Sequence, residues 1–313
     1  MKALVVDLGG SHATCALVED RKIIRTKTLV TEASKELATV LPQLADALQT
    51  IMSEAGVKPS DCEGLALCFC GLADHAHTRV ASTNAKYDDA PQLDLPGWCE
   101  KSLGVRFEIE NDARMALLGE WYAGAARGYE DVVMVTLGTG IGGAAMIQGH
   151  LLRGKHAQAG CLGGHLPVLF NGRRCTCGAT GCAEAEASGW SLPEICRATD
   201  GFTSSPLPKE NAITFERLFH HASAGDPVAI EVRDRCLKVW AVATVGLIHA
   251  YDPEVVVFGG GVMKSASMIL PFLQDYVNHN AWTPWGKVSL RCAELGNQAA
   301  LLGAIPLLQG QAD

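Results

Sequence analysis

The 313-residue chain lacks three features that would assign it to a large class of proteins at once. It has no excess of positive charge, because 34 acidic residues outnumber 26 lysines and arginines and give a formal net charge of −8. This balance opposes general affinity for nucleic acids or anionic membranes. The longest apolar run, VWAVATVGLIHAY, is too short to cross a bilayer. No low-complexity tail or linker interrupts the chain, so we expect a globular protein of two ordinary domains.

We also expect no secretory leader, since the opening MKALVVDLGG reaches Asp7 after only a short apolar run. The 12 cysteines are numerous but scattered through apolar segments such as LALCFCGLA. Reduced thiols without an export signal are typical of a reducing compartment. We therefore expect a cytoplasmic protein.

One segment, HLPVLFNGRRCTCGATGC, concentrates metal-binding residue types at the spacing H-x9-C-x-C-x4-C. It offers an imidazole and three thiols, the ligand set of a closed tetrahedral zinc site. The alternative is a set of unrelated buried cysteines, which are common in protein cores. Two glycines and a basic Arg-Arg pair within the segment argue against a packed core. The sequence therefore predicts a structural Zn²⁺ held by His165, Cys175, Cys177 and Cys182.

Two stretches of the chain are built alike. Residues 3–28 and 131–154 each read as an apolar strand, a glycine turn, a second apolar strand, a polar turn and a third strand. Short connections of this kind join antiparallel strands. A feature repeated about half a chain apart indicates two lobes of related architecture.

Helical patterns follow each repeat. Apolar residues recur at helical spacing from Leu37 to Met52, where Pro42 predicts either a kink or a helix start. Residues 112–126 and 227–251 also read as helices, and residues 63–71 as a short buried strand of a parallel sheet. The whole predicts an α/β protein of two lobes with a cleft between them.

Glycine runs follow apolar strands at three places, and such runs let backbone N–H groups approach phosphate oxygens closely. One run alone is usually only a turn, but three at strand ends are stronger evidence. The predicted phosphate-binding residues are Gly9, Gly10, Ser11, Gly138, Thr139, Gly140, Gly259, Gly260 and Gly261.

The second run also matches the dinucleotide pattern G-x-G-x-x-G. That interpretation needs a helix directly after the glycines and an acidic residue about 20 positions later. The sequence continues instead as AAMIQGHLLRG, which reads as strand and turn, and no G-x-x-x-x-G-K-[ST] motif occurs. Nicotinamide, flavin and P-loop nucleotide sites are therefore disfavoured.

Carboxylates stand beside these elements at two junctions. Asp7 directly precedes the first glycine turn, and it either bonds its own turn or holds Mg²⁺ beside nucleotide phosphates. In FEIENDARMALLGEW, Asn111 or Asp112 either caps a helix, or Asn111 binds a sugar hydroxyl while Asp112 orients the attacking one. Glu184, two residues past Cys182, is either a solvated helix-start carboxylate or a further substrate ligand.

Taken in order, DLGGS, ENDA, LGTGIGG, the G-H…C-x-C-G-x-x-G-C-x-E segment and DPEVVVFGGG resemble the ROK family of sugar kinases and repressors, within the actin-like sugar-kinase superfamily. The resemblance runs through nearly the whole chain to the AALLGAIPLL helix. It implies a two-lobed, ribonuclease H-like fold. The boundaries expected from it are a small lobe over 1–112, joined by a C-terminal helix near 297–313, and a large lobe over 113–296.

The resemblance also implies an activity and its ligands. It implies ATP- and Mg²⁺-dependent phosphorylation of a hexose at O6, of glucose type or an N-acyl hexosamine, by a homodimer. Asp112 would be the catalytic aspartate. The sugar would contact Gly71, Asn111, His165 and Glu184, with His165 also a zinc ligand. ATP phosphates would meet 7–11 and 138–143, and the adenosine 259–261.

Two departures concern the pocket. The family usually has a sugar-binding glutamate in G-E-x-G-H, but the segment here is AGCLGGH, which puts Leu162 or Cys161 at that position. The opposite rim has Cys70-Gly71 in place of a Pro-Gly turn. Kinase chemistry is thus better supported than glucose as the acceptor, and the phosphate donor, ATP or polyphosphate, is open.

Two other functions are alternatives to sugar kinase activity. A ROK repressor would carry a helix-turn-helix domain before the first phosphate loop, for which Asp7 leaves no room in this sequence. A sugar-binding protein of the same fold without catalysis is the second, and it is motivated by the missing glutamate.

Overall fold

The fold is described from a computed structural model of the chain, with residues 33, 35, 84, 312 and 313 outside the described part. The chain forms two compact units. Unit 1 comprises Met1–Tyr129, Gln148–Gly160 and Glu294–Asp313, and unit 2 comprises Glu130–Ile147 and Cys161–Ala293.

The sheet of unit 1 has its strands in the order β3-β2-β1-β4-β7. These strands are β1 (Lys2–Leu8), β2 (His12–Glu19), β3 (Lys22–Val30), β4 (Cys62–Phe69) and β7 (Phe107–Asn111). The first three are antiparallel neighbours, whereas β4 runs parallel to β1 and β7 parallel to β4. β1 and β4 are buried along most of their length, as strands covered on both faces should be. A separate small hairpin pairs β5 (Leu72–Ala73) with β6 (Val80–Ser82).

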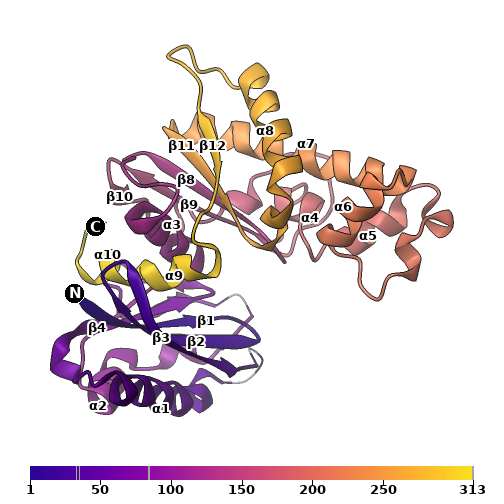
Figure 1. The fold of residues 1–313 in the computed structure, drawn as a ribbon. Coiled ribbons are helices and arrows are strands. Elements are labelled where there is room, and N and C mark those ends of the chain that lie inside the picture. The colour runs from indigo at the N-terminus through magenta and orange to yellow at the C-terminus, as the bar shows by residue number, and fades with distance from the viewer. Residues whose placement is uncertain (33, 35, 84, 312–313) are drawn as a thin grey trace. The chain divides into compact units, whose positions relative to one another are not determined.

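Helices cover both faces of this sheet. They are α1 (Leu37–Ala55), α2 (Leu95–Leu103), α3 (Asp112–Ala123), α9 (Ala299–Leu302) and α10 (Ala304–Leu308). α1 and α2 lie on one face, and α9 and α10 lie on the other (Figure 1). α1 buries the apolar stripe from Leu37 to Met52 that its periodicity predicted. Pro42 lies inside α1, so the helix begins one turn before the proline rather than at it.

A second sheet repeats the first one, in the order β10-β9-β8-β11-β12, and its strands other than β10 belong to unit 2. Its strands are β8 (Val132–Leu137), β9 (Ile141–Ile147), β10 (His150–Leu151), β11 (Val255–Gly259) and β12 (Ser289–Cys292). β8 and β9 are antiparallel, and β11 runs parallel to both β8 and β12. The repeat predicted from the two similar stretches of sequence is therefore confirmed.

The helices of unit 2 are α4 (Ala183–Ala187), α5 (Leu192–Ala198), α6 (Phe215–Ser223), α7 (Pro227–Tyr251) and α8 (Ala266–Asn280). α7 has the predicted bounds, and the Asp226 carboxylate caps it by accepting the Ala229 N–H at 2.9 Å. Within the described residues, no helix combines the length and hydrophobicity needed to span a membrane.

The helix predicted over 112–126 is shorter than expected. α3 ends at Ala123, because the buried Glu120 carboxylate accepts the Ala125 N–H at 2.8 Å and takes the chain out of the helix. Unit 1 also continues past the expected boundary at residue 112. α3 packs on α9, and a side chain at Gly119 would collide with the Ala299 carbonyl. The C-terminal segment and α3 therefore belong to one core.

Candidate functional site

The first glycine turn joins β1 to β2 and is held from several sides. The Gly9 N–H donates to the His12 carbonyl at 2.9 Å, and the Gly9 carbonyl accepts the Tyr87 hydroxyl at 2.9 Å. The Thr31 N–H donates to the Ser11 carbonyl at 2.9 Å. The turn is thus fixed in shape, with Ser11 exposed at its tip. Gly10, the remaining residue predicted here, lies in the same turn.

Asn111 and Asp112 lie where β7 passes into α3. Asn111 is the N-cap of α3, and its Oδ1 accepts the N–H groups of Ala113 and Arg114 at 3.0 and 3.3 Å. Its Nδ2 donates to the Gly71 carbonyl at 2.8 Å and to Asp112 Oδ1 at 3.0 Å. The capping interpretation of Asn111 is therefore correct, and the cap also fixes the neighbouring carboxylate.

The Asp112 carboxylate is held by one oxygen only. Oδ1 accepts the Ala113 N–H at 2.8 Å together with the Asn111 amide. Oδ2 takes no hydrogen bond from the residues that the structure describes. This leaves one oxygen of a fixed carboxylate available to a substrate hydroxyl.

Asp112 and Asp7 influence each other. The Asp112 side chain still reaches solvent, but protein atoms on most sides reduce its hydration and raise its pKa, and the charge of Asp7 raises it further. The Ala113 N–H and the charge of Lys86 act in the opposite direction. Burial likewise raises the pKa of Asp7, against a hydrogen bond from the Cys68 thiol. A cation beside these two carboxylates would relieve both effects.

The second glycine run forms the turn between β8 and β9. The Gly138 N–H donates to the Gly140 carbonyl at 3.0 Å, which closes a tight loop. The loop is fastened from outside, because the N–H groups of Gly189 and Trp190 donate to the Gly138 and Thr139 carbonyls, both at 2.9 Å. A Cβ at Gly138 would meet no atom within 4 Å, so the loop has open space beside it.

The third run ends β11. Gly259 is the buried last residue of that strand. Gly260 has φ of +89° and lies against the Leu137 backbone, so a side chain is excluded there. Gly261 opens a 3₁₀ turn, Gly261–Ser265, and has free space around its Cα. These features, together with the loop after β8, give unit 2 two glycine corners on adjacent parallel strands.

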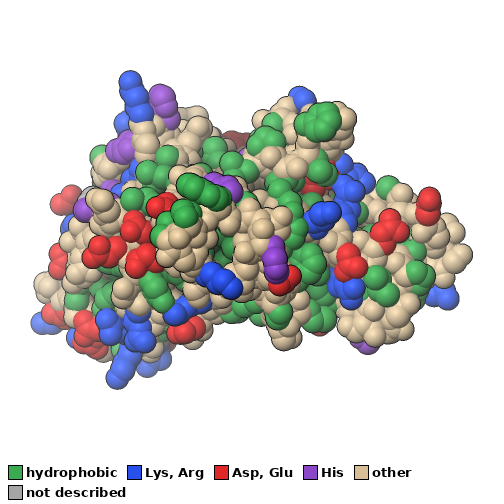
Figure 2. Space-filling model, turned by 90° about the horizontal axis from the view of Figure 1, so that it is seen from above, with side chains coloured by type: hydrophobic (Ala, Val, Ile, Leu, Met, Phe, Trp, Pro, Cys, Tyr) green, Lys and Arg blue, Asp and Glu red, His purple; other side chains and the backbone are tan. Residues whose placement is uncertain are grey.

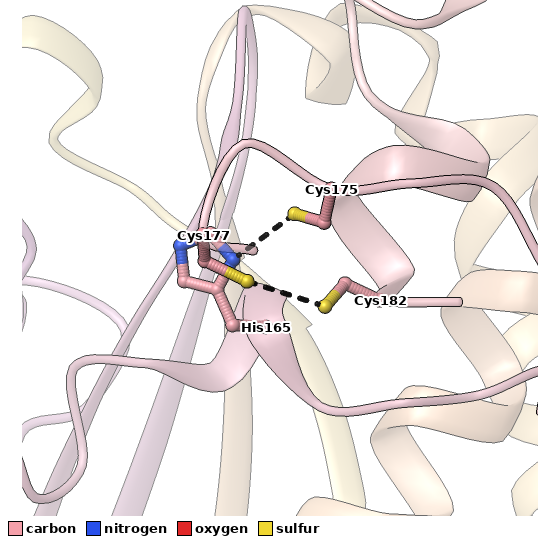
Figure 3. A group of neighbouring side chains, drawn as sticks. All are labelled: His165, Cys175, Cys177 and Cys182. Atoms are coloured by element: carbon pink, nitrogen blue, oxygen red, sulfur yellow. Dashed lines mark hydrogen bonds between the residues drawn. The ribbon is translucent and has the colours of Figure 1, made fainter. Parts of the chain in front are cut away.

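The predicted zinc ligands form one cluster, in which the four side chains point toward one another (Figure 3). Their ligand atoms all lie within 4.8 Å of one another. Cys175 Sγ is 3.5 Å from His165 Nδ1, and Cys177 Sγ is 3.6 Å from Cys182 Sγ. Ideal zinc bonds give edges of about 3.6 Å for N–S and about 3.8 Å for S–S. The donor set and its spacing fit a tetrahedral Zn²⁺, with His165 bound through Nδ1.

A buried carboxylate that the sequence did not single out fastens the loop of this cluster. Glu186 of α4 has no exposed surface, accepts the Arg173 N–H and pairs with the Arg235 guanidinium of α7. In the sequence, only its position two residues after Glu184 could have pointed to Glu186. Glu186 ties the metal loop to the longest helix of unit 2.

His165 and Glu184 lie opposite each other on paired backbone segments. Pro167 forms an antiparallel bridge with Cys182, and the Ala183 N–H donates to the Leu166 carbonyl at 3.0 Å. Glu184 Oε2 in turn accepts the Ile141 N–H of the second glycine loop at 2.9 Å. A Cβ at Gly140 would lie 2.6 Å from that oxygen, so the loop approaches the carboxylate closely. The metal cluster, the two predicted sugar ligands and a phosphate loop are therefore contiguous.

Comparison with known proteins identifies the family of this chain. The model of the ROK family matches residues 3–311. The chain belongs to the ROK family.

Three ROK relatives illustrate the similarity. The glucokinase of Thermotoga maritima is 31% identical over 316 residues, which covers 99% of this chain and 98% of that protein. The crystal structure of a ROK hexokinase from Thermus thermophilus has 30% identity and a TM-score of 0.79, covering 97% of this chain and 96% of that one. A ROK glucokinase from Streptomyces griseus, solved with glucose and AMPPNP, has 26% identity and a TM-score of 0.80, covering 99% and 100%. The mixed α/β, actin-like fold is confirmed.

A buried ionic network behind the α3 junction of this ROK chain was not predicted. Glu110 is 1% exposed and pairs with Arg114 at 3.3 Å and Arg153 at 3.1 Å. The His77 ring lies 3.7 Å from the same carboxylate. Arg114 Nη2 also donates to the carbonyls of Leu152, Ala157 and Ala159. The network fastens the segment 152–159 to the strand end that carries Asn111 and Asp112.

Charged side chains of both signs lie on the surface. On the face shown in Figure 2, lysines and arginines are interspersed with aspartates and glutamates, and neither sign covers a continuous area.

Proposed function

We propose that this ROK protein is an ATP-dependent hexose kinase. The observation that carries the proposal is the Asp112 carboxylate, which Asn111 and the Ala113 N–H fix by one oxygen while the other is free to bind a hydroxyl. Glycine turns follow β1, β8 and β11, and turns of this kind suit the close approach of phosphate oxygens to backbone N–H groups. The similarity to glucokinases and a hexokinase supports a hexose as the acceptor.

In the proposed reaction, the oxygen of a sugar hydroxyl, O6 by family resemblance, forms a bond to the γ-phosphorus of ATP. The bond between that phosphorus and the bridging oxygen of ADP breaks, and the hydroxyl proton passes to Asp112. Phosphoryl transfer has a loose transition state, so orientation of the hydroxyl contributes more than proton removal. Asn111 acts through Asp112 as a positioning residue and contributes to the sugar contacts, while the Gly71 carbonyl fixes the amide.

The two metals have separate roles in the proposal. Asp7, with its raised pKa beside Asp112, would hold Mg²⁺, which supplies charge neutralisation of the phosphates when bound. Zn²⁺ at the cluster of His165 and the three cysteines is structural. Because Nδ1 faces the sulfurs, the ring leaves Nε2 for a sugar hydroxyl. Glu184 is the second sugar ligand of this unit.

Location and assembly belong to the same proposal. None of the 12 cysteines, all of which lie among the described residues, forms a disulfide, which supports a reducing, cytoplasmic location. A homodimer, without nucleic acid or membrane partners, follows from family resemblance and from the acidic composition.

The test is an assay with Mg²⁺ and a panel of hexoses and N-acyl hexosamines, which follows ADP release when ATP is the donor and sugar phosphate formation when polyphosphate is the donor. The proposal expects one or more sugars to stimulate ADP release. If a sugar binds but none is phosphorylated by either donor, the protein is instead the non-catalytic sugar-binding member of the family.

A further inference from the structure

Trp190 lies between the metal cluster and the second glycine loop, although no sequence motif singled it out. Its backbone N–H is one of the two that fasten the loop, donating to the Thr139 carbonyl at 2.9 Å. Trp190 is 36% exposed. The indole is therefore anchored by its backbone and open on part of its surface.

The polar edge of the indole is directed at a predicted sugar ligand. Trp190 Nε1 donates to Glu184 Oε1 at 3.3 Å, while the Ile141 N–H donates to Oε2 at 2.9 Å. Each carboxylate oxygen accepts about two hydrogen bonds, so both retain capacity for a hydroxyl. The carboxylate is held in place, but it is not saturated.

We propose that Trp190 is a specificity-determining residue of the acceptor site, whose indole packs on the apolar C–H face of a hexopyranose hydrogen-bonded to Glu184. This rests on the proposed function. A hydroxyl that donates to Oε1 lies about 2.7 Å from it. The indole nitrogen is 3.3 Å from that oxygen, so the hydroxyl oxygen and the indole nitrogen lie no more than about 6 Å apart.

The proposed contact between Trp190 and the sugar is consistent with the loss of a glutamate from the sugar pocket. Where relatives are expected to have a glutamate, this chain has Leu162, which is 42% exposed, or the half-buried Cys161. The acceptor site of this chain therefore offers the sugar apolar surface where relatives are expected to offer a second carboxylate. A tryptophan supplies an apolar ring face together with one N–H donor. A flat ring favours a sugar face made of C–H groups and disfavours an epimer with an axial hydroxyl on that face.

The experiment compares Trp190→Phe and Trp190→Ala with wild type, and uses Trp282→Phe as the matched control. Trp282 is 79% exposed and follows α8. Initial rates are measured with glucose and with its axial epimers mannose and galactose, and with whichever panel sugar is the best substrate. Zinc content and circular dichroism establish that each variant is folded.

We expect Trp190→Ala to raise the KM for sugar about tenfold or more, and Trp190→Phe to raise it less, because it keeps an aromatic face. The KM for ATP should change less than about twofold, since the backbone bonds to the glycine loop survive both changes. The preference for the best sugar over its axial epimers should fall in Trp190→Ala. Sugar added without ATP should change the tryptophan fluorescence of wild type and Trp282→Phe, but not of Trp190→Phe.

A sugar KM in Trp190→Ala within twofold of wild type overturns the inference, as does an equal rise in the KM for ATP. A wild-type protein that consumes no sugar of the panel defeats the proposed function instead. In that case the fluorescence titration with sugar alone still decides whether Trp190 contacts the ligand.

Discussion

Asp112 is the side chain on which the proposed chemistry depends most directly. The variant Asp112→Asn keeps an amide oxygen that can accept the Ala113 N–H, but it loses the negative charge and the basic carboxylate oxygen. We expect an intact fold, unchanged ATP binding and a kcat lower by roughly 10²–10⁴-fold. Equilibrium ATP binding and steady-state rates measure the two effects separately. A variant with wild-type turnover would remove Asp112 from the mechanism.

The raised pKa values of Asp7 and Asp112 predict a pH dependence. A carboxyl with a raised pKa takes up its proton at a higher pH than an ordinary aspartate, near 4, so activity should fall on acidification earlier than that value suggests. Lys86 lowers the pKa of Asp112, and Lys86→Met should therefore move the acidic limb of the kcat profile to higher pH. Lys101→Met, at the last turn of α2, is the control. An unmoved limb in Lys86→Met would show that another group sets it.

Among the larger elements, the metal loop is the clearest case of a local structure that needs an ion. It contains only short turns and two isolated bridges, so its own hydrogen bonds give it little stability. Cys177→Ser should lower the zinc content and the melting temperature together. Cys62→Ser, a thiol at the start of β4, should keep one zinc per chain. Metal analysis and thermal unfolding measure both, and one zinc retained by Cys177→Ser would contradict the ligand assignment.

The ionic network at the α3 junction makes a second prediction about an element. Arg114 is fully buried, and its loss would leave Glu110 without one of its partners and three carbonyls without their donor. Arg114→Met should cost about 3–5 kcal/mol of unfolding free energy, since breaking a buried pair strands the remaining charge. Arg25→Met breaks a solvent-exposed pair with Glu54 and should cost little. Denaturant unfolding of the two variants checks the contrast.

For the whole molecule, the sequence predicted those features that depend on local pattern. The strand–turn–strand repeats, the bounds of α7 and the ligand spacing of the metal cluster are set by neighbouring residues, and the structure confirms them. The fold followed from the order of several motifs along the chain. These motifs also gave the predicted site residues, whose roles stay predictions.

Two of the ion pairs that the sequence did not predict join residues far apart in the chain. Glu186 meets Arg235, and Glu110 meets Arg153, across separations that leave no periodic signal. The end of α3 was misplaced because Glu120 captures the Ala125 N–H, a side-chain effect that propensity does not register. The sequence did not predict a role for Trp190 either, because that role depends on which carboxylate its ring nitrogen reaches.

The position of the last helices has a consequence for how the protein is made. α9 and α10 pack against α3, β1 and β4, so the core of unit 1 takes its final layer from the end of the chain. A ribosome delivers those residues after every described strand of both sheets. Until then β1 and β4 expose an apolar face, and a chain that is still being translated needs protection from aggregation there. The core of unit 1 therefore closes only once α9 and α10 have been translated, and a chain truncated before them would keep an unsealed core.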